Sequence, residues 1–168
     1  MSGRAVSSLL KRNNYQVLAI DSANNPAVQK AKEELAEEGI KAILGEEAHR
    51  EIGKDDVVVL SPGIKPHSPV YEWVKARKNQ ILSELDVGFL FCQAPIIAVT
   101  GSNGKSTVVT LAAKILEHTG KKLWLRGNIG TPLSLDADRM NGDDLVVCEA
   151  SSFQLAESRW FRPKIAVV

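Results

Sequence analysis

The chain has 168 residues, 44% of them hydrophobic and 24% charged, which is enough to bury a core in one domain or in two small ones. Its formal net charge is +1 and its aromatic content is 5%, so the composition favours neither a nucleic-acid surface nor binding to an anionic membrane. Because no apolar run reaches membrane-spanning length and no leader pattern begins the chain, we expect a cytoplasmic location, with neither nucleic acid nor a membrane as partner.

Apolar runs of strand and helix character alternate in the first half of the chain, after a helical pattern at the N-terminus. The run at 56–60 is continuous, as in a parallel strand covered on both faces, and the turn residues that follow end it. Asp21 and Ser22 follow the first strand, where open α/β folds contact a ribose or base, although a polar loop residue or helix cap gives the same pattern. The predicted elements are strands over 16–20, 40–44, 56–60 and 80–82, and helices over 26–38, 68–78 and 83–91.

A glycine-rich segment, 100–107, joins an apolar, β-branched strand at 95–99 to a helical pattern at 108–116. Its glycines allow the backbone to approach a phosphate, which the N–H groups of the helix start and the charge of Lys105 would hold. Ser106 would offer its hydroxyl to magnesium. Val99 stands where the full phosphate-loop pattern has its first glycine, and a glycine turn before a capped helix is the alternative. The predicted phosphate-binding residues are Gly101, Ser102, Asn103, Gly104, Lys105, Ser106 and Thr107.

Further polar residues follow predicted strands in the second half of the chain. The strand at 145–148 delivers Glu149, which we interpret as a second magnesium ligand beside Ser106, a solvated strand end being the alternative. Asn128 lies between two glycines, which suits either a tight turn or a hydrogen bond to a bound polar group. Ser151 lies at a strand-to-helix turn, where its hydroxyl is either a helix cap or a ligand donor. The other predicted strands are 121–125 and 164–168.

The alternation of strands and helices predicts an α/β fold of two parallel-sheet units. The first, 1–93, is expected to be a Rossmann-like domain that lacks its first strand, since only the first three residues could belong to an initial glycine loop. The second, 94–168, is expected to be the front part of a P-loop ATPase domain, and the final run reads as the start of a buried strand. Both ends therefore look interrupted. Cys92 and Cys148 lie in apolar surroundings and are expected to be buried free thiols.

Four segments together resemble the Mur ligases, the ATP-dependent amide ligases of peptidoglycan synthesis in cell wall biogenesis. Two of them, at 149–155 and 61–64, are most similar to the members of that family that add D-glutamate. The order and spacing of the four also match, and the resemblance extends over essentially the whole chain. The segments are TGSNGKST at 100–107, GNIG at 127–130, EASSFQL at 149–155 and SPGI at 61–64.

The resemblance implies an ADP-forming ligase whose substrates are ATP, UDP-N-acetylmuramoyl-L-alanine and D-glutamate, and whose cofactor is Mg²⁺. ATP would phosphorylate the substrate carboxylate, and the amine of D-glutamate would attack the acyl phosphate to form an amide and release phosphate. By matching motif, Lys105 would hold the β- and γ-phosphates, and Ser106 and Glu149 would ligate one Mg²⁺. Lys105 and Asn128 are the residues that the resemblance assigns to catalysis. The implied substrate contacts are Ser22, Ser61, Gly63, Asn128, Ser151 and Gln154.

The sequence also departs from the family. The metal-binding histidine, the carbamylated lysine and the C-terminal ligase domain of the family would lie beyond Val168, so we expect the chain to be inactive by itself. We also expect a monomer. Another Mur-type or a folylpolyglutamate-type ligase is one alternative, and a non-catalytic nucleotide-binding module is another.

Overall fold

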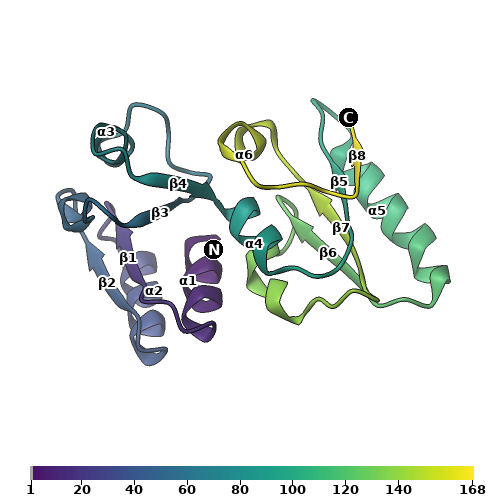
Figure 1. Cartoon of the computed structure of the whole chain (residues 1–168), viewed down its shortest axis with the longest axis horizontal. Helices are drawn as coiled ribbons and strands as arrows, with labels where there is room; N and C mark the ends of the chain where they lie inside the picture. The colour runs from purple at the N-terminus through teal and green to yellow at the C-terminus, as the bar shows by residue number, and fades with distance from the viewer. Residues whose placement is uncertain (1) are drawn as a thin grey trace. The chain divides into compact units, whose positions relative to one another are not determined.

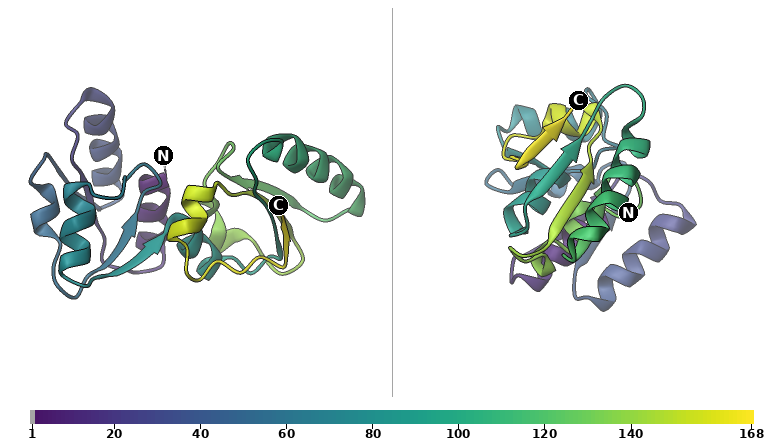
Figure 2. Two further views of the ribbon diagram at one scale, coloured as in Figure 1. Left: turned by 90° about the horizontal axis from the view of Figure 1, so that it is seen from above. Right: turned by 90° about the vertical axis from the view of Figure 1, so that its right-hand side faces the viewer.

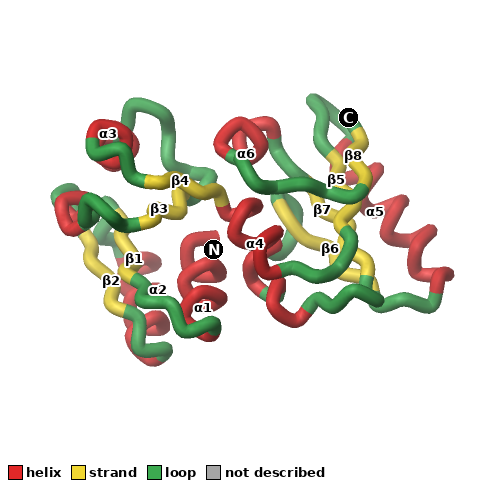
Figure 3. The backbone as a smooth tube through the Cα atoms, in the orientation of Figure 1, coloured by secondary structure: helices red, strands yellow, loops and turns green. Residues whose placement is uncertain are grey.

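The chain, whose computed structural model describes residues 2–168, divides into two compact units, Met1–Leu82 and Ser83–Val168. Each unit combines helices with parallel or paired strands (Figures 1 and 3), which confirms the predicted α/β class. The boundary expected from the sequence, after residue 93, lies one helix later than this division. That helix, α4 (Glu84–Phe91), packs against η3 (Leu133–Leu135) of the second unit. None of the helices in residues 2–168 combines the length and the hydrophobicity of a membrane-spanning segment.

The first unit carries two pairs of strands. In one pair β1 and β2 run parallel, and α2 begins where the Asn25 side chain accepts a hydrogen bond of 3.1 Å from the Val28 N–H. β3 pairs with β4, and its first residue, Val57, is 54% exposed whereas Leu60 is buried. The expectation that this run is covered on both faces is therefore wrong at its start. The elements are α1 (Ser2–Arg12), β1 (Leu18–Asp21), α2 (Pro26–Glu37), β2 (Lys41–Leu44), η1 (Ala48–Glu51), β3 (Val57–Leu60), α3 (Pro69–Ala76) and β4 (Gln80–Ser83).

The second unit is built on one parallel sheet with strand order β6-β7-β5-β8. The loop and helix that follow β5 are those predicted to bind phosphate, although α5 begins at Lys105, earlier than the apolar pattern at 108–116. The remaining elements are β5 (Ile96–Val99), α5 (Lys105–Leu116), η2 (Glu117–Thr119), β6 (Leu123–Gly127), η4 (Ala137–Arg139), β7 (Leu145–Glu149), α6 (Ser152–Glu157) and β8 (Ile165–Val167).

Alternating residues of the central strands face two separate apolar clusters. Because successive side chains of a strand point to opposite faces, Val146 and Cys148 of β7 enter one cluster while Val147 enters the other. The first cluster includes Leu85 of α4 and Leu133 of η3. The second cluster includes Val109 of α5. Figure 2 shows the helix α5 lying along one face of the sheet. The sheet is thus covered by helical segments on both faces.

The final strand differs from its prediction as a buried element. β8 pairs with β5 at an edge of the sheet, and its side chains are exposed, with Ile165 at 52% and Val167 at 39%. The reason is that α5 packs over β5, β6 and β7, and β8 lies outside that cover. Cys148 is buried and free as expected, whereas Cys92, also free, is only partly buried. Burial raises the pKa of both thiols.

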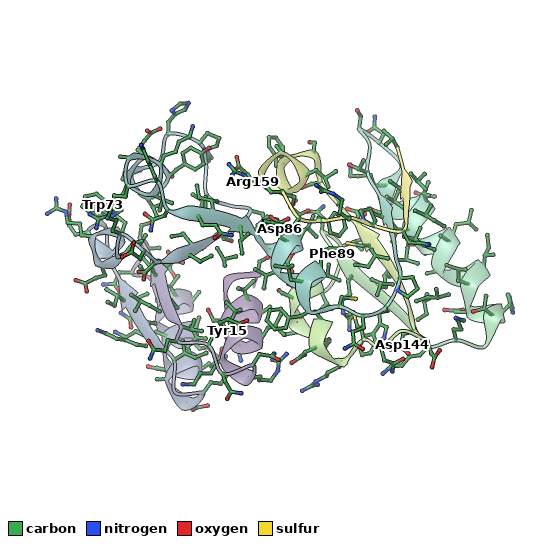
Figure 4. All side chains as sticks on the ribbon, in the orientation of Figure 1. Tyr15, Trp73, Asp86, Phe89, Asp144 and Arg159 are labelled. Carbon is green, nitrogen blue, oxygen red and sulfur yellow. The ribbon has the colours of Figure 1, made fainter. Side chains whose placement is uncertain are left out.

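A buried carboxylate, that of Asp86, ties α4 to the segment after α6 (Figure 4). Asp86 accepts hydrogen bonds from the backbone N–H groups of Ser83, Arg159, Trp160 and Phe161, at distances of 2.7–3.2 Å. Burial alone would raise the pKa of this carboxyl, but the hydrogen bonds, led by that of Ser83, hold it below its ordinary value. Ser83 in turn caps α4, with a 3.0 Å bond from the Asp86 N–H to its side chain.

Asp86→Asn should destabilise the chain by about 2–3 kcal/mol at neutral pH. The asparagine side chain carries no charge, and its NH₂ group would face backbone N–H donors that now bind a carboxylate oxygen. Since the pKa of Asp86 is depressed in the folded state, this stability is present above the unfolded pKa and is lost as the pH falls through the folded one. Urea unfolding at several pH values measures it. Asp143→Asn, at an exposed position, serves as control. If the free energies of unfolding of Asp86→Asn and wild type differ by the same amount down to acid pH, the assignment is contradicted.

Candidate nucleotide and magnesium site

The loop between β5 and α5 has the backbone geometry of an anion site. Gly101 has a φ of 136° and Gly104 a φ of 79°, a region that residues with a side chain rarely adopt. Gly104 is the N-cap of α5, and no side chain caps the helix there. The first N–H groups of α5 therefore face outward without an intrahelical acceptor, at the positive end of the helix. This end of the helix can bind a phosphate.

Lys105 folds back over its own loop. Its Nζ donates to the carbonyl oxygen of Gly101 at 2.8 Å and to that of Ser102 at 3.3 Å. Residues 102–104 are exposed, so a ligand can reach the loop from solvent. The ammonium group is thus held beside the loop by two neutral carbonyl oxygens. A phosphate oxygen is a stronger, charged acceptor and can replace these carbonyls as its hydrogen-bond partner.

The carboxylate of Glu149 connects the loop to the segment that follows β6. Glu149 is 2% exposed. Its Oε2 accepts from the Ser106 hydroxyl at 2.7 Å, and its Oε1 accepts from the Asn128 side-chain amide at 2.9 Å. Both donors are neutral, so they satisfy the oxygens without neutralising the charge. A buried carboxylate in this state attracts a cation.

Strand register brings these residues together. Glu149 of β7 lies opposite Val99 of β5 on one side and opposite Gly127 of β6 on the other. All three positions are the last residues of parallel strands, so the phosphate loop, Glu149 and Asn128 share one edge of the sheet. Ligands of open α/β sheets bind at this edge. The predicted proximity of Ser106 and Glu149 is present in the structure.

Gly127 has a role that sequence reasoning missed. Its φ is 109°, and a Cβ placed there would lie 2.1 Å from the carbonyl oxygen of Glu149. The same approach lets the Asn128 N–H donate to that carbonyl at 2.8 Å. Only glycine permits this contact, which sets Asn128 beside the carboxylate. The signal in the sequence was the glycine directly before Asn128, in a segment that suits either a tight turn or a hydrogen bond to a bound polar group, neither of which predicts this backbone contact.

The oxygen donors of Ser106 and Glu149 match the preference of Mg²⁺ for hard ligands. Residues 2–168 contain no group of three His, Cys, Asp or Glu side chains that could hold a metal by themselves. Magnesium bound through one or two protein oxygens takes its other ligands from phosphates and water. The donor set therefore fits a magnesium ion that arrives with a nucleotide.

Ser151 and Gln154 form a capping box at the start of α6. The Gln154 N–H donates to Ser151 Oγ at 3.2 Å, and the Ser151 N–H and hydroxyl both donate to Gln154 Oε1 at 3.0 Å. Of the two readings open from the sequence, the structure contains the helix cap. A role of these side chains in substrate binding stays a prediction.

The predicted substrate residues of the first unit lie after separate strands. Ser22 follows β1 and is exposed, and the adjacent Asp21 accepts from the Ala23 N–H at 2.9 Å in a local turn. Ser61 follows β3, where its carbonyl accepts from the Ile64 N–H at 2.9 Å, and Gly63 is exposed within that turn. An open hollow lined by residues 43–48 and Glu51 lies next to the end of β1. Contacts of these residues with a nucleotide stay predictions.

Comparisons with known proteins agree with this geometry. Residues 99–168 match the Mur ligase middle domain. The chain is 40% identical over 171 residues to a UDP-N-acetylmuramoylalanine--D-glutamate ligase of Streptococcus uberis, covering 99% of this chain and 37% of that protein. The ligase of the same name from Caldanaerobacter subterraneus subsp. tengcongensis is 36% identical, over 100% of this chain and 37% of its own length.

One solved structure shows the same fold. The UDP-N-acetylmuramate:L-alanyl-gamma-D-glutamyl-meso-diaminopimelate ligase from Neisseria meningitides matches with a TM-score of 0.55 and 19% identity, over 97% of this chain and 55% of that one. The chain spans 37% of the length of the two curated relatives described above. The match to the Mur ligase middle domain includes the phosphate loop and Glu149, and the similarity to the two D-glutamate ligases extends over the whole chain.

Proposed function

We propose that this chain provides the nucleotide-binding part of an ADP-forming ligase that adds D-glutamate to UDP-N-acetylmuramoyl-L-alanine. The names of the relatives at 36–40% identity support the substrates. One observation supports the site more than any other, namely the 2.7 Å hydrogen bond between Ser106 at the phosphate loop and the buried carboxylate of Glu149. It joins an anion-binding helix end to a cation-binding side chain.

In the proposed site, the N–H groups of the glycine loop and of the start of α5 bind the phosphates of ATP. Lys105 exchanges the carbonyls of Gly101 and Ser102 for phosphate oxygens, and so places its charge beside the β- and γ-phosphates. Ser106 and Glu149 hold Mg²⁺, which when bound offsets the phosphate charge. Asn128 keeps Glu149 in place through its side-chain amide.

The proposed reaction forms one amide bond for each ATP. The substrate carboxylate attacks the γ-phosphorus and ADP leaves, which gives an acyl phosphate. The amine of D-glutamate then attacks the carbonyl carbon, loses its proton and displaces phosphate. Lys105 stabilises charge on the transferred group, since phosphoryl transfer depends mainly on positioning and electrostatics.

Substrate contacts follow from the same proposal. Asn128, Ser151 and Gln154 lie beyond the ends of β6 and β7, and we assign them to the muramoyl-alanine and diphosphate part of the substrate. Ser22, Ser61 and Gly63 are assigned to the uridine nucleotide. Ser151 and Gln154 must open their capping box to use the same atoms for a ligand.

Lys105→Ala should weaken ATP binding about tenfold or more, because one charge-assisted contact with phosphate contributes about 1.5–3 kcal/mol. Calorimetric titration of the chain with ATP in the presence of Mg²⁺ measures the affinity. Lys114→Ala, which removes an exposed lysine in the last turn of the same helix, is the matched control and should bind like wild type. Equal affinities for wild type and both variants would contradict the phosphate site.

Glu149→Gln should remove most of the gain in ATP affinity that Mg²⁺ produces, because the amide keeps the shape of the side chain without its charge. The affinity without Mg²⁺ should stay close to that of wild type, since the glycine loop and Lys105 are unchanged. Titrations with and without Mg²⁺ give both values, with the exposed Glu117→Gln as control. A Glu149→Gln variant with the wild-type response to Mg²⁺ would exclude Glu149 as a ligand.

A further inference from the structure

Glu84 is another buried carboxyl group of the second unit, and the proposed mechanism does not use it. It lies in the first turn of α4 and is 2% exposed. Its Oε1 accepts from the Ser134 N–H at 2.7 Å, while its Oε2 has no hydrogen-bond partner among residues 2–168. Burial raises the pKa of Glu84, although the bonds from Ser134 oppose the shift. Burying a carboxyl group with one unpaired oxygen costs free energy, so we expect its contact with Ser134 to have a role.

A second contact joins the same two elements. Gly88 lies one helical turn after Glu84, on the same face of α4. A Cβ at Gly88 would lie 2.6 Å from Cγ of Leu133, the residue before Ser134. Leu133 and Ser134 are both 0% exposed. Backbone and side-chain contacts from α4 therefore hold η3 in one position.

The loop that carries Asn128 leads directly into η3. Within this loop the Gly127 N–H donates to the Thr131 carbonyl at 2.9 Å, which closes it into a compact turn. Asn128 then holds Glu149 by two bonds, from its backbone N–H and from its side chain. A displacement of η3 would move the end of this short loop, and with it Asn128.

We propose that Glu84 is a positioning residue for the magnesium site: its carboxyl oxygen holds the Ser134 N–H, which fixes η3 and so sets Asn128 against the carboxylate of Glu149. The proposal deepens the proposed function and rests on it. Glu84 acts only through the Asn128 loop and does not contact the ligand. It also explains why an acid occupies a buried position where an apolar side chain would leave the Ser134 N–H without an acceptor.

The test is the factor by which saturating Mg²⁺ raises the affinity of the 168-residue chain for ATP. In Glu84→Ala this factor should fall about tenfold, with the affinity in the absence of Mg²⁺ unchanged. Glu84→Gln should keep the wild-type factor, because the amide oxygen still accepts from the Ser134 N–H. A folded Glu84→Ala variant with the wild-type factor would overturn the proposal.

Asp86→Asn separates positioning from a general loss of stability. Asp86 lies on the same helix and is equally buried, but it bonds to residues 159–161 and not to η3. The Asp86→Asn substitution should lower the free energy of unfolding and leave unchanged the factor by which Mg²⁺ raises the affinity for ATP. An equal fall of the factor in Asp86→Asn and Glu84→Ala would reduce Glu84 to a structural role.

A double-mutant cycle with Asn128→Ala tests the route. If Glu84 acts through Asn128, adding Glu84→Ala to Asn128→Ala should not lower the Mg²⁺ factor further. Additive effects would contradict an action of Glu84 through Asn128.

Should Glu84→Ala fail to fold, Glu84→Asp keeps the carboxyl group but is one methylene shorter, and a folded Asp variant with the wild-type factor would again overturn the proposal. If wild type itself binds ATP without any response to Mg²⁺, the proposed function fails first.

Discussion

The buried carboxylate of Glu149 is the constraint on which the second unit depends. A charge that is 2% exposed is costly unless its oxygens are hydrogen-bonded and a cation can reach it. Ser106 and Asn128 supply the hydrogen bonds, and a magnesium ion brought by a nucleotide would supply the charge. The last residues of β5, β6 and β7 are arranged around this group, and Gly127 has no side chain because the Glu149 carbonyl occupies that space.

Two other buried acids of this unit, Asp86 and Glu84, lie on α4, and their environments push their pKa values in opposite directions. Asp86 is surrounded by backbone donors that keep it ionised, and it fastens the segment after α6. Glu84 accepts a hydrogen bond from the Ser134 N–H, but its burial raises its pKa and so favours the neutral form; it contacts the segment after the Asn128 loop. One short helix thus holds two separate segments of the second unit, although it contributes no ligand of its own.

Much of this was predictable from the sequence, because the signals are local. Apolar runs indicated β5 and β7, the glycines and Lys105 indicated the loop, and a strand that ends in an acid indicated Glu149. The errors concern contacts between distant residues. The exposure of β8 depends on which strands α5 covers, and the approach of Gly127 to Glu149 depends on register. The pattern Ser83-x-x-Asp86 does indicate a capping box, but not that the same carboxylate binds residues 159–161.

The central claim is that nucleotide and metal meet between Ser106 and Glu149, and paramagnetic NMR tests it most directly. Mn²⁺ prefers the same oxygen ligands as Mg²⁺ and broadens the amide signals near it. Bound with ATP, it should broaden the signals of Ser106, Asn128 and Glu149 most strongly. Gly120 lies beyond the far end of α5, whose 12 residues span about 18 Å, and its signal should change little. Equal broadening at Gly120 and Ser106, or none at either, would contradict the site.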